Sequence, residues 1–446
     1  MTFFKVTALR KPPARPTSKI QIMAGKPADS PSVTISRRGA DRIRAGHVWV
    51  YRSDIVEAKD VPPGAVVTVQ ELSDKNVRPT RPLPGTDVRP ARPPRTLGTA
   101  FYSTASQIAL RMISLHPVKD LDQLLRERIR DAIAYRDRFV ENTNAYRVIF
   151  SEGDFLPGVI VDRYNDILSM QVLTQAMDSE HIREGVISEL KEKLQPAAIV
   201  EKVEARVRQL EQLPGKESGL VYEDAARGRP LLQGQVATEF QMNGVRFVYG
   251  AVGGQKTGAF LDQRENYAAA EKYARGEALD VFCYQGGFAL HLARACEKVT
   301  GADSSRPALE IAEKNAGLNG REIEWIEANA FDLLRDYSDQ GKKYDCIVLD
   351  PPAFAKSKRD LATALRGYKE LNLRVLKMLR PGGILVTCSC SYHVSALDLL
   401  EVVASAAQDS HRIIRILENR GQSKDHPSVL GIPETAYLKC IIALVK

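Results

Sequence analysis

The sequence lacks any run of apolar residues long enough to cross a membrane, and its first residues, MTFFKVTALRKPPARP, lack the long apolar core of a signal peptide. Its six cysteines in 446 residues, two of them in Cys388-Ser389-Cys390, do not form the pattern of a disulfide framework. No cysteine or histidine residues stand at the spacings of a zinc site, so we expect no structural metal. These absences predict a protein of the reducing cytoplasm with no membrane partner.

Positive charge is concentrated at the start of the chain. The net charge is +8, and the first fifty residues carry ten lysine and arginine residues against two acidic ones. Such a basic segment favours a polyanion such as nucleic acid, although a solvated tail that aids solubility explains the same composition. Residues 1–31, rich in proline, lysine and serine and without periodicity, are predicted to be a disordered basic extension.

The next two parts of the chain have different patterns. Residues 32–118 contain short β-branched and aromatic runs, as in a small β-barrel, with a Pro/Arg-rich insertion at 75–95 that cannot continue a sheet. Residues 119–237 combine strands with helices expected at about 120–140 and 180–194. The second part is therefore predicted to be a central α/β domain.

The last part, residues 238–446, begins with a hairpin predicted from Asn243-Gly244. From about Thr257 onward, strands alternate with helical segments, which is typical of a doubly wound parallel sheet. Two further apolar segments at the end are predicted to form a strand pair.

Four loops after successive predicted strands form a candidate cofactor site. Loops at the carboxyl ends of parallel strands meet at one edge of a sheet, and an acid after the second strand is placed to bind two ribose hydroxyls. Ordinary turn residues are the alternative, and the first two loops also fit a dinucleotide-dependent oxidoreductase. The residues are Gly286 and Gly287 after the first strand, Asp303 after the second, Asn329 and Ala330 after the third, and Asp350 after the fourth.

The segment VTCSCSY (386–392), at the end of the following predicted strand, contains the candidate nucleophile. Strand alternation would place Cys388 and Cys390 on one face. A thiolate can add to C6 of a pyrimidine, so that C5 becomes nucleophilic enough to accept a methyl group. The preceding Asp350-Pro351-Pro352 also fits a second chemistry, in which the loop holds an exocyclic amine. Two inert cysteines in a buried strand are the structural alternative.

The segment TGAFLDQREN (257–266) lies just before the first helix of this last part. Phe260 is predicted to stack on the cofactor or the base, and Arg264 to contact RNA or an acidic loop. A helix N-terminal cap with a core phenylalanine is the alternative.

Several linked motifs resemble one known family. They are similar to those of the bacterial large-subunit rRNA cytosine-C5 methyltransferases that carry an N-terminal PUA domain, and the resemblance covers nearly everything from about residue 32 onward. It implies a PUA-type β-barrel, a central α/β domain and a Rossmann-like class I methyltransferase domain, with S-adenosylmethionine (SAM) as cofactor, large-subunit rRNA as partner and often a homodimer. The motifs are GHVWVYRSDI (46–55), DFLPGVIVDRY (154–164), KTGAFLDQRENY (256–267), VFCYQGGF, LDPPAFAKSK, GYKELNLRVLKMLRPGG, VTCSCS, ENRGQSKDHP (418–427) and PETAYLKC (433–440).

The resemblance also implies roles for residues at matching positions. Cys390 aligns best with the nucleophile, Cys388 is the second choice, and Asp350 is the third catalytic residue. Three features depart from the family pattern: Gln285 replaces the more usual threonine, Asn329 stands where aspartate is frequent, and the insertion interrupts the PUA domain. The implied cofactor-binding residues are Phe260, Asp280, Phe282, Tyr284, Gly286, Gly287, Asp303, Asn329, Ala330 and Asp350. The implied substrate-binding residues are Arg264, Pro351, Pro352, Phe354 and Lys356.

We therefore expect SAM-dependent formation of 5-methylcytosine in large-subunit rRNA by covalent cysteine catalysis. One alternative is N-methylation of a guanine or adenine in rRNA through the DPP loop. Another is a non-catalytic RNA-binding assembly factor that keeps the fold. RNA containing 5-fluorocytidine separates the first two, because only C5 methylation forms a covalent adduct, and loss of SAM binding would favour the third.

Overall fold

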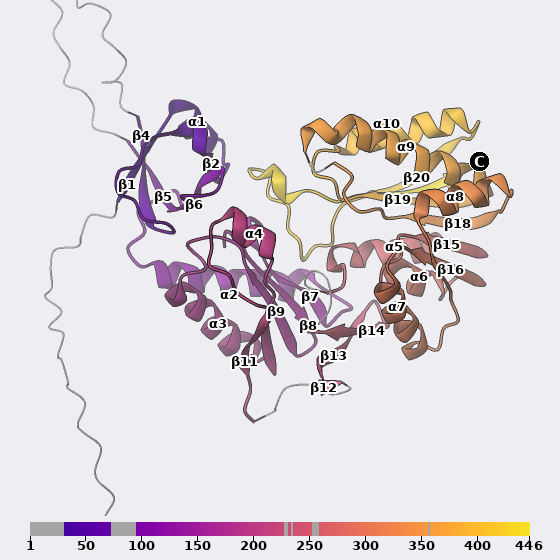
Figure 1. Ribbon diagram of the computed structural model, residues 1–446, viewed down its shortest axis with the longest axis horizontal. Coiled ribbons are helices and arrows are strands. Elements are labelled where there is room, and N and C mark those ends of the chain that lie inside the picture. The colour runs from indigo at the N-terminus through magenta and orange to yellow at the C-terminus, as the bar shows by residue number, and fades with distance from the viewer. Residues whose placement is uncertain (1–30, 73–94, 227–230, 233–234, 252–257, 356) are drawn as a thin grey trace, which may run out of the picture.

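The computed structural model describes residues 31–72, 95–226, 231–232, 235–251, 258–355 and 357–446, which form three folded units in chain order (Figure 1). Residues 1–30 of the predicted basic extension, nearly all of the predicted 75–95 insertion and Lys356 lie outside the described residues. Within the described ranges, no helix is long and apolar enough to span a bilayer.

The first unit is a small β-rich domain around one six-stranded sheet. Its elements are β1 (Ser32–Ile35), α1 (Arg37–Arg44), β2 (Trp49–Tyr51), β3 (Ile55–Glu57), β4 (Val66–Glu71), β5 (Thr96–Tyr102) and β6 (Ile108–Ser114). The strand order is β2-β6-β5-β4-β1-β3. The sequence pattern predicted only strands, so α1 was missed. The Ser36 hydroxyl caps this helix by accepting a hydrogen bond from the Gly39 amide (3.2 Å).

The second unit is an α/β domain with a five-stranded sheet. Its elements are α2 (Leu121–Phe139), β7 (Ala145–Phe150), β8 (Val159–Tyr164), β9 (Ile167–Val172), α3 (Glu180–Leu194), β10 (Ala198–Glu201), α4 (Ala205–Leu210) and β11 (Gly219–Glu223). The strand order is β11-β10-β9-β8-β7. The helices predicted at about 120–140 and 180–194 are confirmed as α2 and α3.

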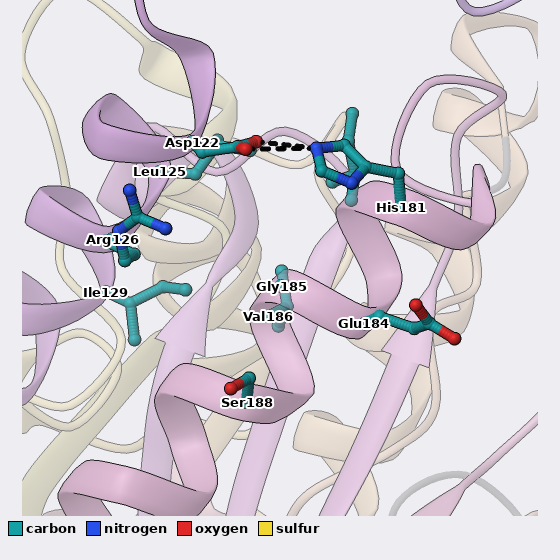
Figure 2. A pocket seen from close by; sticks show the side chains of 10 residues that line it. Asp122, Leu125, Arg126, Ile129, His181, Glu184, Gly185, Val186 and Ser188 are labelled. Carbon is teal, nitrogen blue, oxygen red and sulfur yellow. Dashed lines mark hydrogen bonds and ion pairs between the residues drawn. The ribbon is translucent and has the colours of Figure 1, made fainter. Parts of the chain in front are cut away.

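Helices α2 and α3 lie side by side and enclose a surface pocket of about 260 Å³ (Figure 2). An ion pair between His181 Nε2 and Asp122 Oδ1 (2.9 Å) joins the two helices. Both side chains are largely exposed to water, so this pair contributes little to stability.

A short three-stranded sheet leads into the last unit, with the strands β12 (Leu231–Leu232), β13 (Gln235–Met242) and β14 (Val245–Gly250). The hairpin turn predicted at Asn243-Gly244 is confirmed, and both residues have positive φ angles of 53° and 79°. The domain boundary predicted at residue 238 falls inside β13, so the first strand of the hairpin begins before the predicted boundary and ends after it.

The third unit is built on a seven-stranded sheet with the order β17-β16-β15-β18-β19-β21-β20. Strands β17 (Glu324–Glu327), β16 (Lys298–Asp303), β15 (Glu277–Val281), β18 (Tyr344–Leu349) and β19 (Leu379–Ser389) are parallel, as predicted. The predicted terminal strand pair is also confirmed: β21 (Lys439–Val445) runs antiparallel to both β19 and β20 (Ile414–Arg420).

Helices cover both faces of this sheet, which gives three layers (Figure 1). Helices α5 (Arg264–Tyr273) and α6 (Gly287–Leu292) contribute to one buried apolar cluster. Helices α8 (Ala330–Asp339), α9 (Leu361–Met378) and α10 (Ala396–Asp409) contribute to the other. The remaining helix, α7 (Arg306–Leu318), packs against β14, β16 and β17.

The three units are joined by side-chain contacts. Tyr164 of β8 stacks on Tyr249 of β14 with ring centroids 4.0 Å apart, so the core of the third unit continues into the second. The first unit reaches the third through His47 Nε2, which lies 3.1 Å from the Glu434 carboxylate.

Candidate active site

The carboxyl ends of β15, β16, β18 and β19 lie next to one another at one edge of the sheet. Val281 at the end of β15 is opposite Ala302 of β16 on one side and Leu349 of β18 on the other. Leu349 is in turn opposite Thr387 of β19. The strand order therefore reverses at β15, where open α/β sheets form a ligand-binding crevice.

The loop between β15 and α6 turns sharply. Phe282 and Tyr284 have positive φ angles of 68° and 49°, and Gly286, just before α6, has 84°. The Phe282 and Cys283 amides both donate to the Ala302 carbonyl (2.9 and 3.0 Å), which fastens the loop to β16. Positive φ costs about 1–3 kcal/mol at a non-glycine residue, and such strain clusters at ligand-binding sites.

The two glycines of this loop are needed for internal packing. A Cβ atom at Gly287 would lie 2.4 Å from Cζ of Tyr267, and one at Gly286 would lie 3.0 Å from the Trp325 ring. The space beside these Cα atoms is thus filled by aromatic rings. The predicted approach of a ligand to the glycine backbone stays a prediction.

Asp303 links the loops after β15 and β16. Its Oδ2 accepts a hydrogen bond from the Tyr284 amide (2.9 Å), and its Oδ1 accepts one from the Ser305 amide (2.9 Å). The side chain is partly exposed at the end of β16. Because a carboxylate has about four acceptor sites, it retains capacity for the two hydroxyls of a ribose.

Asp280 precedes Val281 at the end of β15 and has no exposed surface. Its Oδ2 accepts a hydrogen bond from the Ala289 amide at the start of α6 (2.8 Å). Burial raises the pKa of its carboxyl to about 8, and the charges of Asp350 and Asp303 add to that shift. The direct contact between Asp280 and a cofactor stays a prediction, and burial argues against it, because the residue supports α6 from inside the domain.

The third loop begins α8. Asn329 is exposed, and its Oδ1 accepts hydrogen bonds from the Phe331 and Asp332 amides (2.9 and 3.4 Å), so the side chain caps the helix. The Ala328 amide donates to the Asp303 carbonyl (3.0 Å), which holds this loop beside the second. Ala330 is buried. Recognition of adenine by Asn329 and Ala330 stays a prediction.

The DPP loop follows β18. Asp350 Oδ1 accepts a hydrogen bond from Gln263 Nε2 (2.9 Å). Pro351 is buried and Pro352 is exposed, whereas Phe354 is partly buried and packs 4.8 Å from the Tyr368 ring. Of the proposed substrate contacts in this loop, Pro352 is the most accessible in the described part.

The two cysteines of TCSCS lie in different surroundings. Cys388 has no exposed surface, lies opposite Cys440 of β21, and has a thiol pKa that burial raises well above its ordinary value. Strand β19 ends at Ser389, so the alternation predicted for the two cysteines does not extend to Cys390. Cys390 is partly exposed, and its Sγ lies 3.9 Å from the Pro351 carbonyl oxygen in the DPP loop.

The serines on either side of Cys390 are fixed by one tyrosine. The Ser389 hydroxyl donates to Tyr368 Oη of α9 (3.0 Å), and the same Oη lies 3.1 Å from Ser391 Oγ. Ser391 Oγ also accepts a hydrogen bond from the Ala355 amide after the DPP loop (3.3 Å). These buried bonds hold the thiol between β19 and the DPP loop.

The TGAF segment packs against this site. Phe260 is partly buried and lies edge to face with Tyr284, with ring centroids 5.0 Å apart. Arg264 Nη2 lies 3.2 Å from Asp425 Oδ1 in the 418–427 segment, so this arginine pairs with a single buried carboxylate. The RNA contact stays a prediction, and burial argues against it, since only 2% of the Arg264 surface is exposed.

The sequence interpretation missed the roles of three residues. Gln263 fixes Asp350, Tyr368 fixes the two serines, and Lys439 Nζ donates to the carbonyl oxygens of Ser391 and Tyr437. All three missed residues stand in motifs that carry the family resemblance. No local pattern identifies their partners, because each contact joins segments far apart in the chain.

Comparison with known proteins agrees with this architecture. Residues 224–438 match the family profile of S-adenosylmethionine-dependent methyltransferases, and residues 33–77 match a PUA-like domain. Two similar proteins are called ribosomal RNA large subunit methyltransferase I. The one from Shewanella denitrificans is 36% identical over 410 residues, covering 90% of this chain and 95% of that protein. The one from Tolumonas auensis is 36% identical over 354 residues, covering 78% and 87%.

Solved structures also share the fold. A protein described as a SAM-dependent methyltransferase from Streptococcus mutans superposes with a TM-score of 0.73 at 17% identity, covering 93% of this chain and 99% of that one. A methyltransferase solved with SAH gives a TM-score of 0.75, also at 17% identity and with the same coverage. At such identity these likenesses show a common fold.

Proposed function

Because this chain belongs to the ribosomal RNA large subunit methyltransferase I family, we propose that it methylates the C5 carbon of a cytosine in large-subunit rRNA, with Cys390 as the covalent nucleophile. The reaction class follows from the family: methyl transfer from SAM to large-subunit rRNA. The choice of C5 and the role of Cys390 are the finer parts of the proposal, and they rest on the geometry of the site.

The position and exposure of the Cys390 thiol support C5 chemistry. Its thiol lies at the carboxyl edge of the sheet, partly exposed and beside the DPP loop, while the other cysteine of the motif is closed off. The bonds from Tyr368 to Ser389 and Ser391 hold the segment in place, so little ordering is needed before reaction.

The chemistry assigned to Cys390 is addition and elimination. The thiolate forms a bond to C6, and the electrons of the C5=C6 double bond shift toward C5. When bound, SAM supplies the electrophilic methyl group that C5 accepts. Loss of the C5 proton to a base restores the double bond and expels the thiolate, which regenerates the enzyme.

The DPP loop is assigned to holding the base. The Asp350 carboxylate, oriented by Gln263, is the type of acceptor that matches the N4 amino group of cytosine. Pro352 is exposed next to it, in a position to contact the base ring. Lys356, the remaining substrate contact implied by the resemblance, lies outside the described residues.

The residues that fit SAM lie in the loops after β15, β16 and β17. Asp303 would hold the ribose hydroxyls, and the strained backbone from Phe282 to Gly286 would border the nucleoside. Asn329 and Ala330 would read the adenine, and Phe260 would lie against one side of the ligand through its contact with Tyr284. Asp280 would act indirectly by supporting α6.

RNA substituted with 5-fluorocytidine tests the proposal. Fluorine at C5 cannot leave as a proton, so the enzyme should remain joined to the RNA through Cys390 when SAM is present. A stable adduct on denaturing gels, absent from Cys390→Ala, is the expected result. If methyl transfer proceeds without any adduct and Cys390→Ala remains active, N-methylation through the DPP loop replaces this mechanism.

Two further features belong to the proposal. The family resemblance implies a homodimer, which light scattering of the purified chain tests directly. We also propose that the protein acts in the cytoplasm, where large subunits are assembled, and fractionation of ribosome precursors would test that location.

A further inference from the structure

Lys439 lies next to the end of the strand that leads to the nucleophile. It is the first residue of β21 and lies opposite Ser389, the last residue of β19. Its Nζ donates hydrogen bonds to the carbonyl oxygens of Ser391 (2.6 Å) and Tyr437 (2.8 Å). Because Ser391 directly follows Cys390, the ammonium group is hydrogen-bonded to the backbone next to the thiol.

Few negative groups balance the positive charge of the Lys439 ammonium group. The side chain is only partly exposed, and in the described part of the chain it forms no ion pair with a carboxylate. Burial lowers the pKa of Lys439 to about 8, while the charges of Cys390 and Asp398 oppose that shift. Withdrawing a charge from water without an ion-pair partner is costly, which suggests that this cation serves a nearby anion.

We infer that Lys439 is a positioning residue that keeps Cys390 in its thiolate form, with its ammonium charge stabilising the sulfur anion and its bond to the Ser391 carbonyl fixing the segment. The inference rests on the proposed function, in which Cys390 is the nucleophile. On ionisation the thiol proton passes to water, and a sulfur lone pair becomes available to form the bond to C6. Only the thiolate adds efficiently, so this charge raises the reactive fraction near neutral pH.

Among the described residues, a tyrosine and two acids are the other titratable groups considered around Lys439 and the thiol. Burial raises the pKa of Tyr368 on α9, as do the charges of Cys390 and Asp350, so its hydroxyl stays neutral. Asp350 after β18 and Asp398 on α10 are acidic and would favour the protonated thiol. Of these four described residues, Lys439 is the one that carries a positive charge at neutral pH.

The stabilisation depends on pH in a defined direction. Lys439 is protonated at neutral pH and loses its charge as the pH rises through about 8. Its effect on the thiolate is therefore largest below that value. Cys390 should therefore ionise at a lower pH in the wild type than in a variant that lacks this charge.

The test is the rate at which iodoacetamide alkylates Cys390 in the full-length protein, followed by peptide mass spectrometry between pH 5 and 10. Lys439→Gln should move the midpoint of the plot of alkylation rate against pH to a higher pH. It should also slow alkylation at pH 7 by roughly tenfold, which corresponds to about one pH unit. Lys439→Arg should restore most of the wild-type profile, because it keeps the charge. Lys343→Gln is a matched control, since Lys343 also donates to a backbone carbonyl but lies on an exposed surface.

Identical profiles for wild type and folded Lys439→Gln would overturn the inference. If Lys439→Gln does not fold, Lys439→Met, which keeps the aliphatic length, provides the same comparison, with circular dichroism as the check on folding. Alkylation needs no RNA, so its result is separate from that of the 5-fluorocytidine trap. A shifted profile without an RNA adduct keeps the Lys439–Cys390 pair and rejects the C5 mechanism, whereas an adduct with unshifted profiles does the reverse.

Discussion

The interior of the seven-stranded sheet and its carboxyl edge contain the same residue types in opposite roles. Cys388 and Cys390 are two residues apart, yet the first is closed off opposite Cys440 and the second is partly exposed beside Pro351. Asp280 and Asp303 show the same contrast at the ends of β15 and β16. A side chain at the edge can reach a ligand, whereas its interior counterpart can only support the fold.

The largest effect is expected at the edge. Cys390→Ala should lower the rate of RNA methylation by roughly 10⁴–10⁶-fold, the range found when members of a covalent catalytic unit are removed. The measurement is transfer of a labelled methyl group to rRNA transcripts. SAM affinity by calorimetry should stay near the wild-type value, because Cys390 is not among the residues assigned to the cofactor. A variant that still methylates would erase the distinction between the two cysteines.

The second effect is expected in the interior, and it concerns stability. Arg264→Ala removes the arginine partner of the buried Asp425 carboxylate and leaves His426 beside it, which should lower the free energy of unfolding by about 3–5 kcal/mol. Urea denaturation of the full chain measures this. Arg335→Ala is the control, because its pair with Asp332 is exposed and should contribute less than about 1 kcal/mol. Equal losses in the two variants would contradict the importance of burial.

The pH dependence of this interior pair follows from the Asp425 carboxyl. Burial alone would raise its pKa, but His426 and Arg264 together hold the pKa well below its ordinary value. A lowered carboxyl pKa contributes stability above the ordinary value, near pH 4, and this contribution is lost as the pH falls toward the lowered one. The stability difference between wild type and Arg264→Ala should therefore shrink in acid. If the urea midpoints of wild type and Arg264→Ala differ by the same amount at pH 7 and at pH 3, the result would count against the pairing.

A smaller effect is expected for the cofactor side of the edge. Asp303→Ala should weaken SAM binding by about 1–3 kcal/mol, the scale of lost hydrogen bonds to a charged group. Calorimetry gives the affinity, and circular dichroism controls for the loss of the bonds to Tyr284 and Ser305. Unchanged affinity would count against binding of the ribose by this residue.

The smallest effect is expected for the interior cysteine. Cys388→Ala removes one buried sulfur atom and should cost about 1 kcal/mol of stability while methylation continues. Thermal unfolding and the methyl-transfer rate are measured on the same preparation. Complete loss of methylation here, together with an active Cys390→Ala, would reverse the roles assigned to the two residues.

Local sequence patterns predicted much of the fold. The alternation of strands and helices after residue 257, the Asn243-Gly244 hairpin and the helices α2 and α3 depend on neighbours within a few residues, which the sequence shows directly. Helix α1 was missed because its segment is short and basic, and its start depends on the Ser36 cap.

The site was predicted less completely, for a physical reason. The sequence identified the four loops and Cys390, because these follow strand ends. It gave no indication that Asp280 would be buried, and it did not name the acid that pairs with Arg264, since both depend on how distant segments pack. The contact between Lys439 and Ser391 depends on the placement of β21 between β19 and β20, and nothing in either strand alone specifies that order.

The placement of β21 also determines when the site can be completed during protein synthesis. Strand β19 pairs with β18 and β21, whereas β20, which is translated before β21, pairs only with β21. In a nascent chain whose β21 has not yet emerged from the ribosome, β19 is therefore an unpaired edge of the sheet. Cys388 is then uncovered, and Lys439 is not yet beside the site. Unpaired edges favour aggregation, and free thiols are open to oxidation. Translation of β21 both closes that edge and delivers the cation to the nucleophile.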